Sequence, residues 1–111
     1  MKDNTDTISE FLKVLAHPIR LRIIECLKAG EKSVNDIQSE LNKSQSTISQ
    51  HLKILTNANI MTYRKNGLKS YYKISQPKIH AIILALSQYI SELNKDHIED
   101  ITNGDIIDTL Y

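Results

Sequence analysis

The segment between residues 44 and 60, SQSTISQHLKILTNANI, combines hydroxyl, amide, imidazole and lysine side chains and contains no carboxylate. Such groups donate and accept hydrogen bonds, which is the chemistry that recognises base edges and phosphates. Helices on the surface of a soluble protein normally mix both signs of charge. A helix face of this composition would instead approach a polyanion without repulsion.

Helical spacing separates this segment into two faces. At 100° per residue Ile48, Leu52 and Leu55 fall together, which predicts the buried stripe of a helix over residues 44–58. Ile54 fits neither face, and we expect it to pack beneath a neighbouring element. The other face is polar and predicts a surface shaped for the major groove of DNA. Its candidate DNA-contacting residues are Ser44, Gln45, Ser46, Thr47, Ser49, Gln50, His51 and Lys53.

Charge is segregated along the chain, although the formal net charge is only +1. Residues 41–91 contain no Asp or Glu, but they contain seven of the 14 basic residues. The alternative is an ordinary solvated face that happens to be rich in lysine, but such faces usually interleave glutamate. The segregation therefore favours a polyanion partner.

The elements upstream of this helix predict a helix-turn-helix. Apolar residues at i, i+3, i+4 and i+7 predict a first amphipathic helix over residues 8–15. Pro18 suits the first turn of a second helix and Gly30 its end. Ser33 and a carboxylate three residues later resemble a capping box, which opens a short helix that runs to Leu41. A tight connection then leads to the helix with the polar face, and this is the order of a helix-turn-helix.

A basic β-hairpin is predicted over residues 62–73. Asn66-Gly67 is a strong signal for a two-residue turn, because both residues tolerate positive φ. A hairpin directly after a recognition-type helix is a wing, which would contact phosphates and the minor groove. A plain solvated turn would explain the glycine but not the missing acids. The candidate DNA-contacting residues of the wing are Arg64, Lys65 and Lys69.

A long helix is predicted to begin at Pro77 and to continue to residue 95. It carries a broad apolar stripe, which a small winged domain has little surface to cover. We therefore expect a homodimer interface on this helix, shared with the first helix, although an intramolecular groove could also absorb the stripe. The residues of the stripe are Ile79, Ile82, Ile83, Leu86, Ile90 and Leu93.

Length and composition limit the possible classes of protein. The 111 residues fit one domain, which we place at residues 1–98 and which is followed by an acidic tail at 99–111. A single cysteine excludes an intramolecular disulfide. The N-terminus has no signal-peptide pattern, and the longest apolar run, residues 81–86, is too short to span a membrane. We expect a cytoplasmic protein with no membrane partner.

The order of helices and wing resembles the ArsR-type winged-helix repressors, also called the ArsR/SmtB-like family. The matching motifs are LKVLAHPIRLRIIECL (residues 12–27), SVNDIQSELNKSQSTISQHLKILTNANI (33–60) and YRKNGLKSYYKI (63–74). The resemblance implies a mainly α fold with a small β-hairpin, a winged helix-turn-helix of order α-α-α-α-β-β-α. It also implies a dimeric transcription regulator, typically a repressor that leaves DNA when a signal binds. The residues implied to read DNA are Gln45, Ser46, Ser49, Gln50 and His51, with Arg64, Lys65 and Lys69 on the wing.

The chain departs from this family where metals are usually sensed. Metal-sensing members often carry Cys-x-Cys in the first helix of the helix-turn-helix, but residues 33–36 contain no thiol. Another family site lies on the last helix, where this chain has Lys78-Ile79-His80 and, further on, Ser91 and Asn94. We therefore expect no metal site and no cofactor, since transition metals select thiolate- or imidazole-rich ligand sets.

Two further features of the sequence are candidates for a sensory role, a histidine cluster near residue 97 and the single cysteine. His97 with Asp96 and Asp100 forms a loose cluster that lacks the family pattern. Cys26 falls on the apolar face of the second helix, so we expect a buried, inert residue; a redox switch would need an accessible thiol of low pKa.

The sequence thus predicts a dimeric, sequence-specific DNA-binding transcriptional regulator. Its expected partners are double-stranded DNA, as an inverted-repeat operator, and a second copy of the chain; its effector is unknown. The alternative is a winged-helix protein-interaction module without specific DNA binding, which the apolar residues of the acidic tail support slightly. We expect no enzyme, because the four histidines are scattered and no nucleophile or nucleotide-binding loop accompanies them.

Overall fold

The structure is a computed structural model that describes residues 3–96. The chain divides into two compact units, Met1–Pro77 and Lys78–Tyr111. The first unit holds the helix-turn-helix and the wing, and the second begins with the last helix. The acidic tail predicted at residues 99–111 lies outside the described residues.

The break between the first two helices follows from the residues at that point in the sequence. Helix α1 spans Thr5–Leu15 and helix α2 spans Pro18–Cys26, which continues into a short 3₁₀ turn at Leu27–Ala29. Pro18 occupies the first turn of α2, and the imidazole of His17 caps this helix by accepting a hydrogen bond from the backbone N–H of Ile19.

The helix-turn-helix consists of α3 (Val34–Leu41) and α4 (Gln45–Asn57). Ser33 caps α3 through a hydrogen bond from the backbone N–H of Asp36 to its hydroxyl, as the sequence predicted. Between the helices Asn42 adopts the left-handed conformation with φ of 53°, which lets the chain turn sharply. The predicted arrangement is confirmed.

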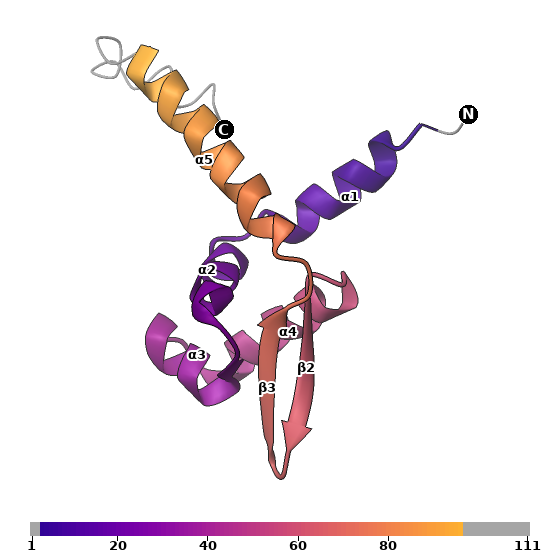
Figure 1. Cartoon of the computed structure of the whole chain (residues 1–111), viewed down its shortest axis with the longest axis vertical. Coiled ribbons are helices and arrows are strands. Elements are labelled where there is room, and N and C mark those ends of the chain that lie inside the picture. The colour runs from indigo at the N-terminus through magenta and orange to yellow at the C-terminus, as the bar shows by residue number, and fades with distance from the viewer. Residues whose placement is uncertain (1–2, 97–111) are drawn as a thin grey trace. The chain divides into compact units, whose positions relative to one another are not determined.

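The wing belongs to a three-stranded antiparallel sheet of order β1-β3-β2 (Figure 1). Strands β2 (Met61–Asn66) and β3 (Lys69–Ile74) form the predicted hairpin. Strand β1 (Lys32–Ser33) pairs with β3 and has only two residues. A strand of two residues leaves no alternating pattern in the sequence and therefore could not be predicted from it.

The hairpin turn lies one residue later than predicted. Asn66 pairs with Lys69, so the two turn residues are Gly67 and Leu68, and Asn66 belongs to strand β2. Gly67 has φ of +65° at the first turn position, which is the position where a type II′ turn requires glycine. The prediction of an Asn66-Gly67 turn is therefore wrong.

The core of the first unit is built from α2, α3, α4 and the base of the sheet. Ile48, Leu52 and Leu55 are buried, which confirms the predicted inner face of α4. Ile54 is 36% exposed, so the expectation that it packs beneath a neighbouring element is wrong. The other buried apolar residues of this unit are Leu15, Ile23, Ile24, Cys26, Leu27, Ile37, Ile60 and Met61.

The second unit begins with α5, which spans Lys78–Asp96 and starts directly after Pro77. Within the described residues no helix combines the length and the apolar character that crossing a membrane would require. Several large apolar side chains of α5 are exposed in the chain. They are Ile82, Leu84, Leu86, Tyr89 and Ile90.

Candidate nucleic-acid interface

The polar face of α4 is exposed as predicted, and its first turn is fixed by Ser44. The Ser44 hydroxyl accepts a hydrogen bond from the backbone N–H of Thr47 at 3.2 Å and donates to the Thr47 hydroxyl at 2.8 Å. The Ser46 hydroxyl lies 3.4 Å from that of Ser44, so three hydroxyl groups gather at the start of this helix. Thr47 and His51 are half-buried, whereas the exposed predicted residues of this face are Ser44, Gln45, Ser46, Ser49, Gln50 and Lys53.

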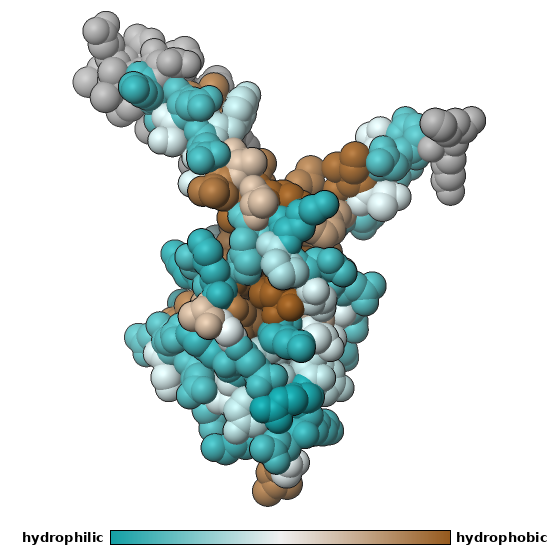
Figure 2. All heavy atoms as spheres, in the orientation of Figure 1, coloured by the Kyte–Doolittle hydropathy of each residue, from teal (hydrophilic) through white to brown (hydrophobic). Residues whose placement is uncertain are grey.

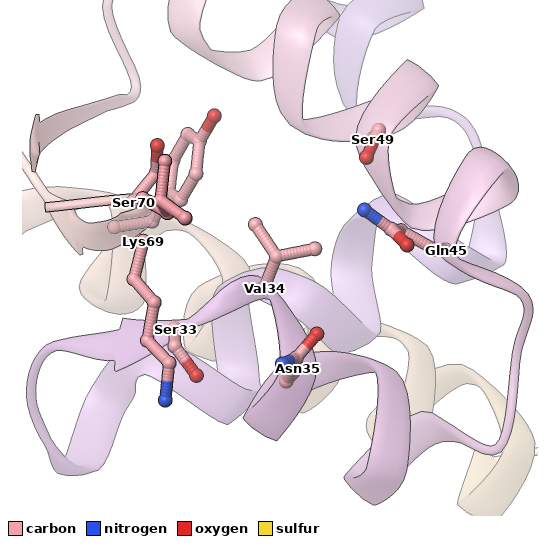
Figure 3. A pocket seen from close by; sticks show the side chains of 9 residues that line it. Ser33, Val34, Asn35, Gln45, Ser49, Lys69 and Ser70 are labelled. Carbon is pink, nitrogen blue, oxygen red and sulfur yellow. The ribbon is translucent and has the colours of Figure 1, made fainter.

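A polar groove of about 490 Å³ lies between α4, the start of α3 and the wing (Figure 3). It brings together Gln45 and Ser49 of α4 and Lys69 of β3, three residues that the sequence predicted separately as DNA contacts. None of the described residues that line this groove carries a carboxylate. Its other lining residues are Ser33, Val34, Asn35, Leu68, Ser70 and Tyr72.

A second groove of about 360 Å³ continues this surface along α4. Ser49 and Tyr72 line both grooves, and Lys53 lines the second. The rings of Tyr63 and Tyr72 lie 5.2 Å apart as a cross-strand pair, and both tyrosines line the second groove together with residues of α4. Hydroxyl, amide, lysine and phenol groups thus border one acid-free surface.

Arg64 lies on the opposite face of the wing from Tyr63. Successive strand residues point to opposite faces, and Arg64 pairs across the hairpin with Tyr71. Its guanidinium stands 4.8 Å from the centre of the Tyr71 ring and makes a bidentate ion pair with Glu31, with N–O distances of 2.8–3.1 Å. The Glu31 carboxylate raises the pKa of Arg64 and compensates its charge.

The ion pair predicts different salt dependences for two neighbouring cations. Lys65→Ala is expected to weaken binding to all duplexes and to lower the slope of log K against log salt by about one, because one phosphate contact is lost. Arg64→Ala should lower the slope by less, because Glu31 already compensates that charge. Fluorescence anisotropy across a salt series measures both slopes, and equal decreases would show that Arg64 leaves Glu31 for a phosphate.

His51 ties the polar helix to the start of α2. Its Nδ1 accepts a hydrogen bond from Nε of Arg20 at 3.1 Å, and its ring centre lies 4.3 Å from that of His17. Arg20 also donates to the backbone carbonyl of Val14 at 3.0 Å, near the end of α1. One arginine therefore links α1, α2 and α4, and His51 serves this link in its neutral form.

The link predicts a loss of stability in mild acid. Burial, and then the nearby His17 and Arg20, lower the pKa of His51 below its ordinary value of 6.5. As the pH falls below about 6.5, the unfolded chain takes up a proton that the folded chain resists, so the free energy of unfolding decreases. Urea unfolding between pH 7.5 and 5 should show this decrease, and His51→Gln should remove part of it. An unchanged pH dependence in the variant would contradict the prediction.

Cys26 is held by two charged neighbours. Its thiol donates a hydrogen bond to Glu40 at 2.7 Å, and Nζ of Lys32 lies 3.6 Å from its sulfur and forms an ion pair with Glu40. Burial and the hydrogen bond to Glu40 raise the pKa of this thiol to about 11. The geometry agrees with the predicted inert residue, because a thiol of this pKa is a poor nucleophile.

No group of three or more His, Cys, Asp and Glu side chains suited to a metal occurs between residues 3 and 95. The loose cluster around His97 lies outside the described residues.

Sequence reasoning missed two contributors to this interface, Glu31 and Arg20. Glu31 lies outside the acid-free segment 41–91, yet folding brings it to Arg64, 33 positions away. Arg20 reaches His51 over 31 positions. Neither contact leaves a local signal, because both depend on how the sheet and the helices meet.

Comparison with known proteins identifies the family. Residues 17–63 match the family described as "Bacterial regulatory protein, arsR family". The helix-turn-helix-type transcriptional regulator Rv0081 of Mycobacterium tuberculosis is 31% identical, over 86% of this chain and 88% of that protein. Its crystal structure aligns with a TM-score of 0.79 at 28% identity, over 88% of this chain and 99% of that one.

Two further relatives agree with this match. The arsenical resistance operon repressor of Staphylococcus xylosus is 34% identical, over 78% of this chain and 80% of that protein. A homodimeric winged helix-turn-helix DNA-binding domain from Mycobacterium bovis aligns with a TM-score of 0.66 at 26% identity, over 87% of this chain and 93% of that one. These relatives are transcriptional regulators, and the fold of this chain is the winged helix-turn-helix. The chain belongs to the ArsR family of bacterial regulatory proteins.

Proposed function

We propose that this regulator is a homodimeric repressor that reads an inverted-repeat operator, with α4 in the major groove and the wing on the adjacent backbone and minor groove. The observation that carries the proposal is the acid-free groove shared by Gln45, Ser49 and Lys69. Short neutral side chains on α4 reach base edges, and the wing lysines reach phosphates.

A homodimer would place two copies of α4 in successive major grooves, about 34 Å apart. The exposed apolar side chains of α5 support self-association through this helix. In the first unit, α1 separately exposes Ile8 at 50% and Leu12 at 46%. Sedimentation equilibrium should therefore give twice the mass of the chain. A monomer at micromolar concentration would contradict this part of the proposal.

The testing experiment is fluorescence anisotropy on DNA from the chain's own promoter and on a scrambled duplex of equal length, across a salt series. A preference for the promoter, with affinity that falls steeply as salt rises, supports the proposal. Equal, weak binding to both duplexes, and to other native promoters, would count against it and favour a module that binds protein instead.

A further inference from the structure

The wing ends in an apolar side chain, Leu68, that is fully exposed at the mouth of the polar groove. Leu68 occupies the second turn position of the hairpin, and its exposure of 107% is the highest among the large apolar side chains of the described residues. Figure 1 shows the hairpin projecting past α3 and α4, and Figure 2 shows an apolar spot at its end on otherwise polar surroundings. The leucine thus adds nothing to the core.

The surroundings of this leucine suit a polyanion. Lys69 follows Leu68 directly and pairs with Asn66. The next pair along the hairpin joins Lys65 to Ser70. Both lysines are exposed, and the turn itself adds no charge. An apolar tip between two cations favours a nucleic-acid groove over a hydrophobic protein pocket, because burial in such a pocket would desolvate the lysines without pairing them.

We propose that Leu68 is a minor-groove wedge: when the wing enters the groove, this side chain presses into a base step while Lys65 and Lys69 contact the flanking phosphates. Apolar wedges of this kind partly unstack a step and bend the duplex. Pyrimidine–purine steps such as TA and CA deform most easily. Leu68 would therefore make binding depend on a base step to which it donates no hydrogen bond. This inference rests on the proposed DNA-binding function and deepens it.

The test uses promoter DNA on which a footprint has located the protein. One duplex carries dyes at both ends to report bending, and a second carries 2-aminopurine at the step under the wing to report unstacking. The wild-type chain should shorten the distance between the dyes and raise the 2-aminopurine fluorescence. Leu68→Ala should abolish both signals and weaken binding about ten-fold, since the buried apolar contact is lost.

The matched control is Leu68→Met, which keeps a long apolar side chain and should retain both signals. The side chain at position 68 is fully exposed, so both variants should unfold at the wild-type urea concentration. Replacing the TA or CA step by a stiffer purine–purine step should weaken the wild-type chain more than Leu68→Ala.

The outcomes separate this inference from the proposed function. If Leu68→Ala binds and bends DNA like the wild-type chain, the wedge is refuted while DNA binding stands. Insertion would also be refuted if Leu68→Ala bound DNA more weakly but the wild-type chain did not raise the 2-aminopurine fluorescence. If the wild-type chain prefers no duplex, the proposed function fails, and the wedge fails with it.

Discussion

Truncation of Leu52 to alanine is expected to lower the free energy of unfolding by about 2–5 kcal/mol. Leu52 is 1% exposed on the inner face of α4, so its loss leaves a cavity where this helix meets the core. Small domains are typically stable by only about 5–15 kcal/mol, so a large part of the total would be lost. Urea unfolding followed by circular dichroism measures the change.

The matched control for Leu52→Ala is Leu68→Ala, the same substitution at an exposed position. It should change the free energy of unfolding by less than about 0.5 kcal/mol. Equal effects at the two positions would contradict the packing of α4. A loss below about 1 kcal/mol at Leu52 alone would show that the neighbouring side chains close the cavity.

Truncation of Gln50 to alanine is expected to reduce discrimination between operator and non-operator DNA by about 1–3 kcal/mol. Gln50 is exposed on the polar face of α4, and a glutamine amide placed there matches the donor and acceptor of adenine in the major groove. Anisotropy titrations on the operator and on single-base variants measure the change. The loss should be confined to one position in each half-site.

The matched control for Gln50→Ala is Gln88→Ala, the same substitution at an exposed position of α5. It should leave the discrimination between bases unchanged. If Gln50→Ala weakened specific and non-specific binding alike, the residue would contact the backbone and not a base. The exposed neighbours of Gln50 on α4 would then be the candidates for contacts with the bases.

Features with a local cause could be predicted from the sequence. The buried face of α4 follows from the spacing of Ile48, Leu52 and Leu55, and the start of α3 follows from the cap at Ser33. Both depend on residues within one or two helical turns. Both features can therefore be predicted from the sequence without knowledge of any tertiary contact.

The hairpin turn shows why a strong local signal is not always decisive. An Asn66-Gly67 turn would pair Met61 with Tyr72, whereas the structure pairs Met61 with Ile74 and Tyr63 with Tyr72. The observed register joins two apolar side chains at the buried end and two aromatic rings above them. These cross-strand contacts outweigh the turn preference of asparagine, and they move Leu68 to the apex.

The candidate site was predictable in composition but not in pairing. Gln45, Ser49 and Lys69 could be named from their types and positions, and the structure places them around one groove. The partner of Arg64 could not be named, because Glu31 reaches it only through the sheet that β1 completes. Residues 41–91 contain no Asp or Glu, but folding still places the carboxylate of Glu31 against Arg64 of the wing.

The raised pKa of Cys26 has a practical consequence for experiments on the wing. With a pKa of about 11, only about one thiol in ten thousand is a thiolate at pH 7. An exposed cysteine with an ordinary pKa near 8.5 is roughly 3% thiolate, a fraction about three hundred-fold larger, so it would react with a maleimide much faster. A dye could therefore be attached through Leu68→Cys at the apex of the wing without first replacing the native cysteine.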